Sequence, residues 1–519
     1  MEQTAGATDL QGRLSERWHE LPPLQRAAVL IVVELVLAAL LLLVDKALGF
    51  AVGTVAAVYW IYRLPPLPWR LGAQAALVLL YLILGPRSFA ILIAAAFAIF
   101  WVPERRRSWV VPLVAIGAAV FYPFYQGHMF TIPVFGAWPD VATGVVMLIF
   151  IMMAIGLNIV VGYAGLLDLG YVAFYATGAY TAAFFTSQQF AGQKCPTPGV
   201  SVANCTVAVV PKRNFDLGAV GLVPGAGGLH ISVWLLLLLA GVITALFGIV
   251  IGLPTLRLRG DYLAIVTLGF GEILPQIARN GDHLFGTNFN LTNGTGGITP
   301  IDGPGFGNWL DQHFHLPANF LTAGNLDSVF LWTGLGLVLI TVFCSARLRD
   351  SRIGRAWIAI REDETAAAAM GVPLMRTKTW SYATGAFFGG VAGAFYASYK
   401  SGAFPDDFFF QISVFILCMV ILGGMGSIWG VIVGAAFLSY LNQEGLANIG
   451  AWMNKNGVSD AVFGKDIDVP LYTSGIFGVI LVLTMLFRPE GLIPSQRRAA
   501  ELHEGVHDEP LYDHEIAGA

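Results

Sequence analysis

Long apolar runs recur through the whole chain, and they constrain its fold more than any other feature of the sequence. Each run is near the ~20 residues that a helix needs to cross the hydrocarbon core of a bilayer. Backbone groups in lipid have no water to bond with, so such runs form helices. We therefore predict an all-α polytopic integral membrane protein with about 12–14 hydrophobic segments. The segments are 27–44, 47–63, 70–84, 88–102, 108–125, 141–162, 167–187, 233–252, 261–278, 328–344, 379–398, 410–424, 428–444 and 472–487.

The composition agrees with a chain surrounded mostly by membrane lipid. Hydrophobic residues make up 56% of the 519 residues and charged residues 12%, whereas a soluble protein carries about 25% charged residues. The formal net charge of −4 gives no reason to expect nucleic acid as a partner.

Lys and Arg residues predict the orientation. When the N-terminus is placed in the cytoplasm, about two thirds of the 29 basic residues fall on the inner side, as the positive-inside rule requires. Both termini are then cytoplasmic. The longest inner connection before the C-terminal tail is 345–378, and the polar loops 188–232, 279–327 and 445–471 face outward.

The chain divides into three parts along its length. Residues 1–130 form an N-terminal membrane extension of about five spans with few motifs. Residues 131–498 form a core domain that contains the 345–378 loop, and residues 499–519 form an acidic cytoplasmic tail.

The 345–378 loop carries a recognisable pattern. Arg355, Arg361, Glu362 and Glu364 precede an alanine run that begins at Ala366. Gly371 and then Pro373 end this run, which predicts a short helix with acids at its N-terminus, as the helix dipole favours. Such a helix suits docking into a groove on another protein. The alternative is a solvated loop that only anchors the topology.

Two sets of glycines repeat every four residues, at Gly385, Gly389 and Gly393 and at Gly426, Gly430 and Gly434. This spacing lets membrane helices approach closely. The close contact is made either within the chain or with a partner protein in the membrane.

Two polar residues within apolar segments need an explanation because polar groups in the membrane are costly. We expect Asn158 and Glu272 to line a translocation path or to stabilise the bundle.

Cys195 and Cys205 share a polar loop that is predicted to face outward. They either form a disulfide or remain two free thiols.

The sequence contains none of the motifs that we would expect of an enzyme or an ATPase. No G-x-x-x-x-G-K-[ST] phosphate loop occurs, since Gly464-Lys465 is followed by Asp466. We find no nucleophile–base pair and predict no metal site. The chain is therefore not expected to be an enzyme, and we expect it to bind no cofactor.

Several stretches resemble the LivM-type permease of branched-chain amino acid importers, an ABC transporter family. The 345–378 loop looks like the "EAA" loop through which such permeases contact their ATPases, although Glu364 and Gly371 are one residue further apart than in the general motif. Family signatures are matched in order by Gly156–Gly170, Gly178–Thr181, Leu258–Glu272, Thr292–Ile298, Gly354–Val372 and Leu422–Ser427.

The resemblance implies a permease of the bacterial inner membrane that works by alternating access. The expected partners are a second related permease in a heterodimer, two cytoplasmic ATPases that use the ATP, and a periplasmic substrate-binding protein. In this interpretation the residues of the 345–378 loop couple ATP hydrolysis to transport, and the carboxylates of Glu362 and Glu364 dock and cap its helix. Two alternatives remain open: import of urea, short amides or other amino acids by the same architecture, and an ion-coupled secondary transporter.

Overall fold

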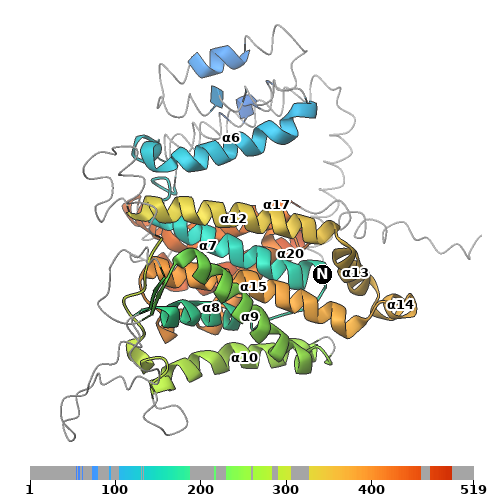
Figure 1. The fold of residues 1–519 in the computed structure, drawn as a ribbon. Coiled ribbons are helices and arrows are strands. Elements are labelled where there is room, and N and C mark those ends of the chain that lie inside the picture. The colour runs from blue at the N-terminus through green and yellow to red at the C-terminus, as the bar shows by residue number, and fades with distance from the viewer. Residues whose placement is uncertain are drawn as a thin grey trace, which may run out of the picture. The chain divides into compact units, whose positions relative to one another are not determined.

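The computed structural model describes most of the chain from Glu104 onward (Figure 1). The described residues are 104–129, 131, 134–187, 215–217, 229–258, 261–282, 290–304, 326–456 and 468–493, with scattered positions between Thr54 and Phe97. They fall into two compact units, 1–138 with 447–467 and 139–446 with 468–519. Each unit is described by itself.

The first unit contains helix α6 (Glu104–Tyr125), which includes the predicted segment 108–125. Pro112 and Pro123 lie inside this helix, and the 3₁₀ turn η1 (Gln126–His128) follows it. A small apolar cluster is formed by Ile61, Ile93 and Phe97, with Val58, Ala73, Leu77 and Val78 packed against it. The predicted segment 27–44 lies outside the described residues.

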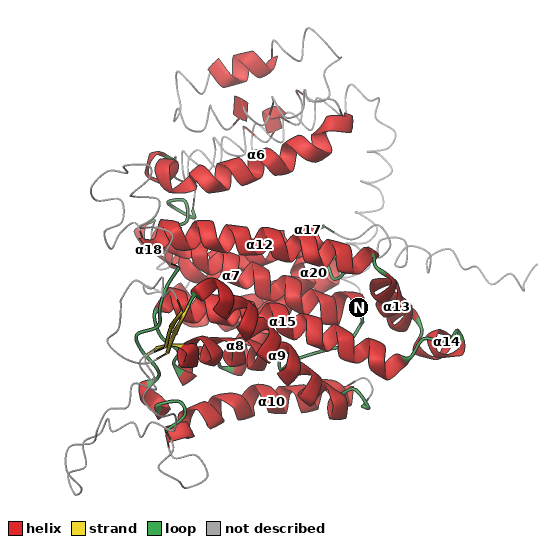
Figure 2. Cartoon of the chain, in the orientation of Figure 1, coloured by secondary structure: helices red, strands yellow, loops and turns green. Residues whose placement is uncertain are grey.

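The second unit is a helical bundle (Figure 2). Its α-helices are α7 (Val141–Asn158), α8 (Val172–Phe185), α9 (Val233–Thr255), α10 (Asp261–Arg279), α12 (Leu326–Asp350), α13 (Arg352–Glu362), α14 (Glu364–Ala369), α15 (Leu374–Lys400), α16 (Phe410–Gly423), α17 (Ile428–Tyr440) and α20 (Thr473–Phe487), and α18 (Leu446–Lys455) begins at the boundary between the units. Two π-helical turns, η2 (Ile159–Tyr163) and η7 (Leu441–Gly445), continue α7 and α17.

Sheet structure in the described residues is limited to three short strands, β1 (Thr186–Ser187), β2 (Phe215–Leu217) and β3 (Leu229–Ile231). β3 lies between the other two, antiparallel to β1 and parallel to β2. The 3₁₀ turns η5 (Gly294–Gly296), η6 (Pro405–Asp407) and η8 (Val469–Tyr472) complete the elements. The predicted helical membrane fold is therefore confirmed.

Five stretches among the described residues are long and apolar enough to cross a membrane. They are Val141–Tyr163, Val233–Thr255, Asp327–Asp350, Pro405–Gly423 and Val469–Phe487, and Val110–Tyr125 and Val172–Phe185 are shorter apolar helices. The structure places longer helices at two predicted segments, because 328–344 lies within α12 and 379–398 lies within α15.

Helix α15 lies at the centre of the second unit and packs against α7, α8 and α9. Glycines make this packing possible. A Cβ atom added to Gly393 would lie 1.9 Å from the backbone oxygen of Tyr175 on α8, and one added to Gly385 would lie 2.5 Å from Val160 Cγ2 on η2. Close approach of this kind maximises dispersion contacts, which hold membrane helices together.

Polar contacts fix both ends of α7. At its start, Glu444 on η7 accepts a hydrogen bond from the backbone N–H of Asp140 (3.0 Å) and another from Thr143. At its end, the side chain of Asn158 is fully buried and accepts a hydrogen bond from the backbone N–H of Gly426 (2.8 Å). A carboxylate at a helix N-terminus is also favoured by the helix dipole.

The packing of α15 on α8 predicts the effect of adding one methyl group. Gly393→Ala should destabilise the protein by about 1–3 kcal/mol, because the new Cβ meets rigid backbone. Gly336→Ala on α12 is the matched control, since nothing lies within 4 Å of its added Cβ. The measurement is the thermal unfolding midpoint in detergent, and equal midpoints for both variants would contradict this account of the packing.

Candidate functional site

The segment between α12 and α15 forms two helices rather than a loop with one helix. Helix α13 was not predicted, and α14 follows it after the single residue Asp363. In Figure 1, α14 projects beyond the helices around it, at the end of the bundle where α12 ends and α15 begins. The sequence did contain a signal for α13, because Ser351 is a typical N-cap residue and the apolar residues Ile353, Trp357 and Ile360 follow at helical spacing.

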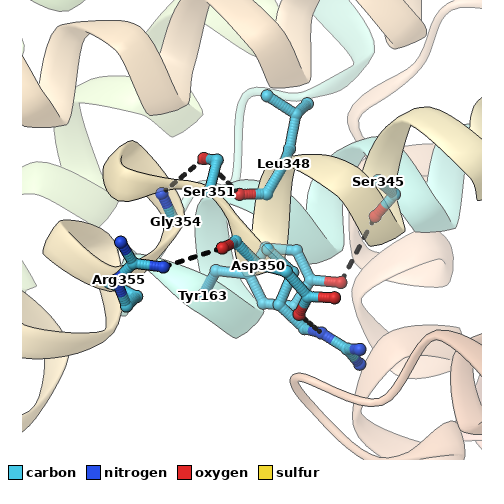
Figure 3. A network of polar contacts seen from close by, with 8 residues as sticks. Tyr163, Ser345, Leu348, Asp350, Ser351, Gly354 and Arg355 are labelled. Carbon is cyan, nitrogen blue, oxygen red and sulfur yellow. Dashed lines mark hydrogen bonds and ion pairs between the residues drawn. The ribbon is translucent and has the colours of Figure 1, made fainter.

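Helix α13 begins in a network of polar contacts (Figure 3). Ser351 Oγ accepts a hydrogen bond from the backbone N–H of Gly354 (3.1 Å) and donates one to the carbonyl of Leu348 (2.7 Å). Nη1 of Arg355 donates to the carbonyl of Asp350 (2.9 Å). Beside them, the hydroxyl groups of Tyr163 and Ser345 lie 3.3 Å apart. These bonds fix the turn between α12 and α13.

Two contacts hold α13 and α14 against the start of α15. Trp357 is fully buried, and its Nε1 donates to the carbonyl of Thr377 (2.9 Å). Lys378 is also buried, and its Nζ lies 2.7 Å from a carboxylate oxygen of Glu364. A buried ammonium needs such a partner because its removal from water is costly. The two helices are therefore a fixed part of the bundle, and we call them the α13–α14 hairpin.

The residue that caps α14 is Asp363, which corrects the prediction for Glu362 and Glu364. Its Oδ1 accepts hydrogen bonds from the backbone N–H groups of Thr365 (2.7 Å) and Ala366 (3.0 Å) and from the Thr365 hydroxyl (2.6 Å). The Thr365 hydroxyl, followed by the two backbone groups, lowers the pKa of the Asp363 carboxyl. Glu364 instead pairs with Lys378.

Side chains on and next to α14 are exposed. They include Glu362 at the end of α13, Ala366 on α14 and Met370 directly after α14, which is 86% exposed. The helix ends before Gly371, which has a φ of +85°, a conformation that glycine adopts without strain. The exposed residues form a small, mostly apolar surface at the tip of the α13–α14 hairpin.

Arg361 connects the hairpin to the membrane bundle. Its Nη1 donates a hydrogen bond of 2.5 Å to the carbonyl of Gly162 on η2. A Cβ added to Gly162 would lie 2.0 Å from Oδ1 of Asn158, which in turn accepts from Gly426. Hydrogen bonds from α13 and from the turn between α16 and α17 therefore reach residues four apart at the π-helical end of α7.

The glycines of both predicted sets pack within the chain. Gly385 and Gly389 face η2 and Tyr171, while Gly430 and Gly434 face backbone atoms of α16. Gly426 is not on a helix face, because it lies in the turn before α17 with a φ of +85°. These contacts favour the first of the two alternatives, close packing within the chain.

The structure separates the remaining predicted residues. Asn158 is buried inside the bundle, whereas Glu272 is exposed on α10. Cys195 and Cys205 lie outside the described residues. In the described part of the chain, no group of three or more His, Cys, Asp or Glu side chains is arranged to hold a metal ion.

A helical bundle with membrane-length apolar helices is the architecture of a polytopic membrane protein. The family described as branched-chain amino acid transport system, permease component, matches residues 141–485. The chain belongs to this family, which confirms the resemblance seen in the sequence.

Three curated relatives show how far the similarity extends. The chain is 32% identical over 389 residues to the high-affinity branched-chain amino acid transport permease LivM of Escherichia coli K12, covering 71% of this chain and 75% of the relative. LivM of Salmonella typhimurium LT2 is also 32% identical, over 388 residues with the same coverage. The permease LivH of Escherichia coli K12 is 24% identical over 189 residues, covering 36% of this chain and 53% of LivH. No solved structure matches the chain.

The cap of α14 predicts a pH dependence. The lowered pKa of Asp363 means that its contribution to helix stability is present above the unfolded pKa of about 3.9 and is lost as the pH falls through the lower folded value. Asp363→Ala should therefore reduce the hydrogen-exchange protection of the Thr365 and Ala366 amides several-fold at neutral pH.

Asp363→Asn is the matched control for this prediction, because an amide oxygen also caps a helix but does not titrate between pH 2 and 7. Its amides should keep their protection at neutral pH. Undiminished protection in Asp363→Ala would contradict the assigned cap.

Proposed function

We propose that this chain is a transmembrane subunit of an ATP-driven importer for branched-chain amino acids. The observation that carries the proposal is the α13–α14 hairpin, a rigid projection with an exposed tip on a member of this permease family. The names of the LivM relatives support branched-chain amino acids as the substrate.

The proposed complex contains a second related permease, two ATPases and a periplasmic substrate-binding protein. Similarity to proteins named LivM and to proteins named LivH supports a pairing of two related permeases. The absence of a phosphate loop in the sequence supports ATP hydrolysis by separate subunits. The proposed location is the bacterial inner membrane, with both termini and the α13–α14 hairpin in the cytoplasm, as the distribution of Lys and Arg favours.

In the proposed mechanism, the tip of α14 sits in a groove of an ATPase and moves when the ATPases close. The Trp357 and Lys378 contacts pass this movement to α15, which lies at the centre of the bundle. The Arg361 hydrogen bond passes it to η2 at the end of α7. The movement thus reaches two core helices at once, which suits a reorientation of the bundle between inward-open and outward-open states.

Ala366 provides a test of ATPase docking. Its side chain is exposed on α14. Ala366→Arg should keep the helix, because arginine is a good helix former, but place a long charged chain in the docking surface. We expect at least a tenfold loss of ATP-driven uptake and a loss of the ATPases on purification.

Ala366→Ser is the control, because serine is nearly as small as alanine, and it should retain both uptake and ATPases. A fully active Ala366→Arg complex would mean that α14 does not contact an ATPase.

The function as a whole is tested by purifying the complex in mild detergent and reconstituting it with its binding protein. We expect a second permease and two ATPases to copurify, and ATP to drive uptake of leucine, isoleucine and valine. Uptake of urea but not leucine would favour the alternative substrate class. Uptake that follows an ion gradient without ATP would overturn the proposal.

A further inference from the structure

The chain between η2 and α8, residues 164–171, is not helical although most of it is buried in the second unit. We call it the α8 entry segment. Hydrogen bonds tie this segment and the start of α8 to three other helices. The backbone N–H of Leu169 donates to the Thr267 hydroxyl on α10 (3.1 Å), the Tyr171 hydroxyl to the Gly385 carbonyl on α15 (2.9 Å), and the backbone N–H of Val172 to the Ser413 hydroxyl on α16 (2.9 Å).

Asp168, in the middle of the α8 entry segment, has a buried oxygen atom without a partner. The residue is 1% exposed. Its Oδ1 accepts a hydrogen bond from the backbone N–H of Gly170 (2.9 Å), whereas its Oδ2 accepts none from the described residues. The Thr267 hydroxyl also lies against this carboxyl group, but its proton is donated to the carbonyl of Ala264 (3.0 Å). Since an unpaired buried acceptor is costly, Oδ2 of Asp168 has the capacity for one further hydrogen bond.

Tyr382 on α15 carries the matching donor. It is fully buried, and its hydroxyl has no hydrogen-bond partner among the described residues. Its ring packs against Phe174 on α8 with the ring centroids 6.1 Å apart, and its hydroxyl lies within reach of the Asp168 charge. The hydrogen bond from Tyr171 to Gly385 joins the same two elements three residues beyond each group. A small relative shift of α15 and the α8 entry segment would therefore bring this donor to its acceptor.

The α13–α14 hairpin contacts the chain just before each of these two groups. A Cβ atom added to Gly165, three residues before the buried aspartate, would lie 2.8 Å from Cγ of Arg361 on α13. Trp357, also on α13, donates to the carbonyl of Thr377, five residues before the buried tyrosine. A displacement of α13 would therefore act on both elements at once and change how they lie against each other.

We propose that Asp168 and Tyr382 are a switch pair, separated in the present conformation and hydrogen-bonded in the other state of the transport cycle. This inference rests on the proposed function, which supplies the second state. In that state the Tyr382 hydroxyl donates to Oδ2 of Asp168, and two buried groups that are unpaired here satisfy each other. The two residues are positioning residues: they link the hairpin to the arrangement of α8 and α15.

Tyr382→Phe tests the pair because it removes only the hydroxyl. We expect ATP-driven leucine uptake by the reconstituted complex to fall by about five- to tenfold, the size that one buried hydrogen bond contributes. The second permease and the ATPases should still copurify. Tyr180→Phe is the matched control, because the Tyr180 hydroxyl on α8 is also buried and unpartnered among the described residues, and it should keep normal uptake. Normal uptake in Tyr382→Phe, or an equal loss in both variants, would overturn the proposal.

Thermal unfolding separates a switch from a purely structural role. The unfolding midpoint of the complex is measured without nucleotide and after trapping with ATP and vanadate. Tyr382→Phe should lower the midpoint in one of these two states and leave it unchanged in the other, because the hydrogen bond exists in one state only. The same change in both states would contradict the switch.

A double-mutant cycle identifies the partner of the hydroxyl. In an Asp168→Ala background, Tyr382→Phe should cause no further loss of uptake, since residues that act through one contact are not additive. Additive losses would show that Tyr382 acts through a residue other than Asp168, and the pair would be wrong.

Two failures can be told apart in these experiments. If the unmodified complex shows ATP-driven uptake but Tyr382→Phe behaves like Tyr180→Phe, the switch pair is wrong and the proposed function stands. If the unmodified complex shows no ATP-driven uptake, the proposed function fails, and the switch pair fails with it.

Discussion

The close approach of α15 to its neighbours is the interaction on which the rest of the structure depends. Lipid offers no hydrophobic driving force between helices, so contact distance and fit decide how strongly they associate. Gly385, Gly390 and Gly393 let α15 meet η2, α9 and α8 at distances that an added Cβ atom would not allow without a shift. The same helix continues past the bundle, and its first turns supply Thr377 and Lys378 to the α13–α14 hairpin.

Because of this continuity, the hairpin and the core form one mechanical unit. The ion pair between Lys378 and Glu364, the Trp357 hydrogen bond and the Arg361 hydrogen bond connect the hairpin to two different core helices. The π-helical turn η2 is the point where one of these connections reaches the bundle. Such turns occur often at functional sites, and here the turn carries the hydrogen bond from Arg361.

Much of the fold followed from the sequence because apolar length is a strong signal in membrane proteins. The family signatures and the existence of α14 were equally visible. The contacts within the candidate site could not be predicted from the sequence, because they depend on which neighbour each side chain reaches in the folded chain. Asp363 rather than Glu362 caps α14 because Asp363 is the residue at the N-cap position, whereas Glu362 is the last residue of α13. The pairing of Glu364 with Lys378 joins two helices, and helical spacing alone does not predict such a contact.

The glycine pattern shows why sequence spacing cannot separate internal packing from partner docking. Small residues at four-residue spacing indicate only that another helix packs closely against that face. In this chain the other helix belongs to the same bundle.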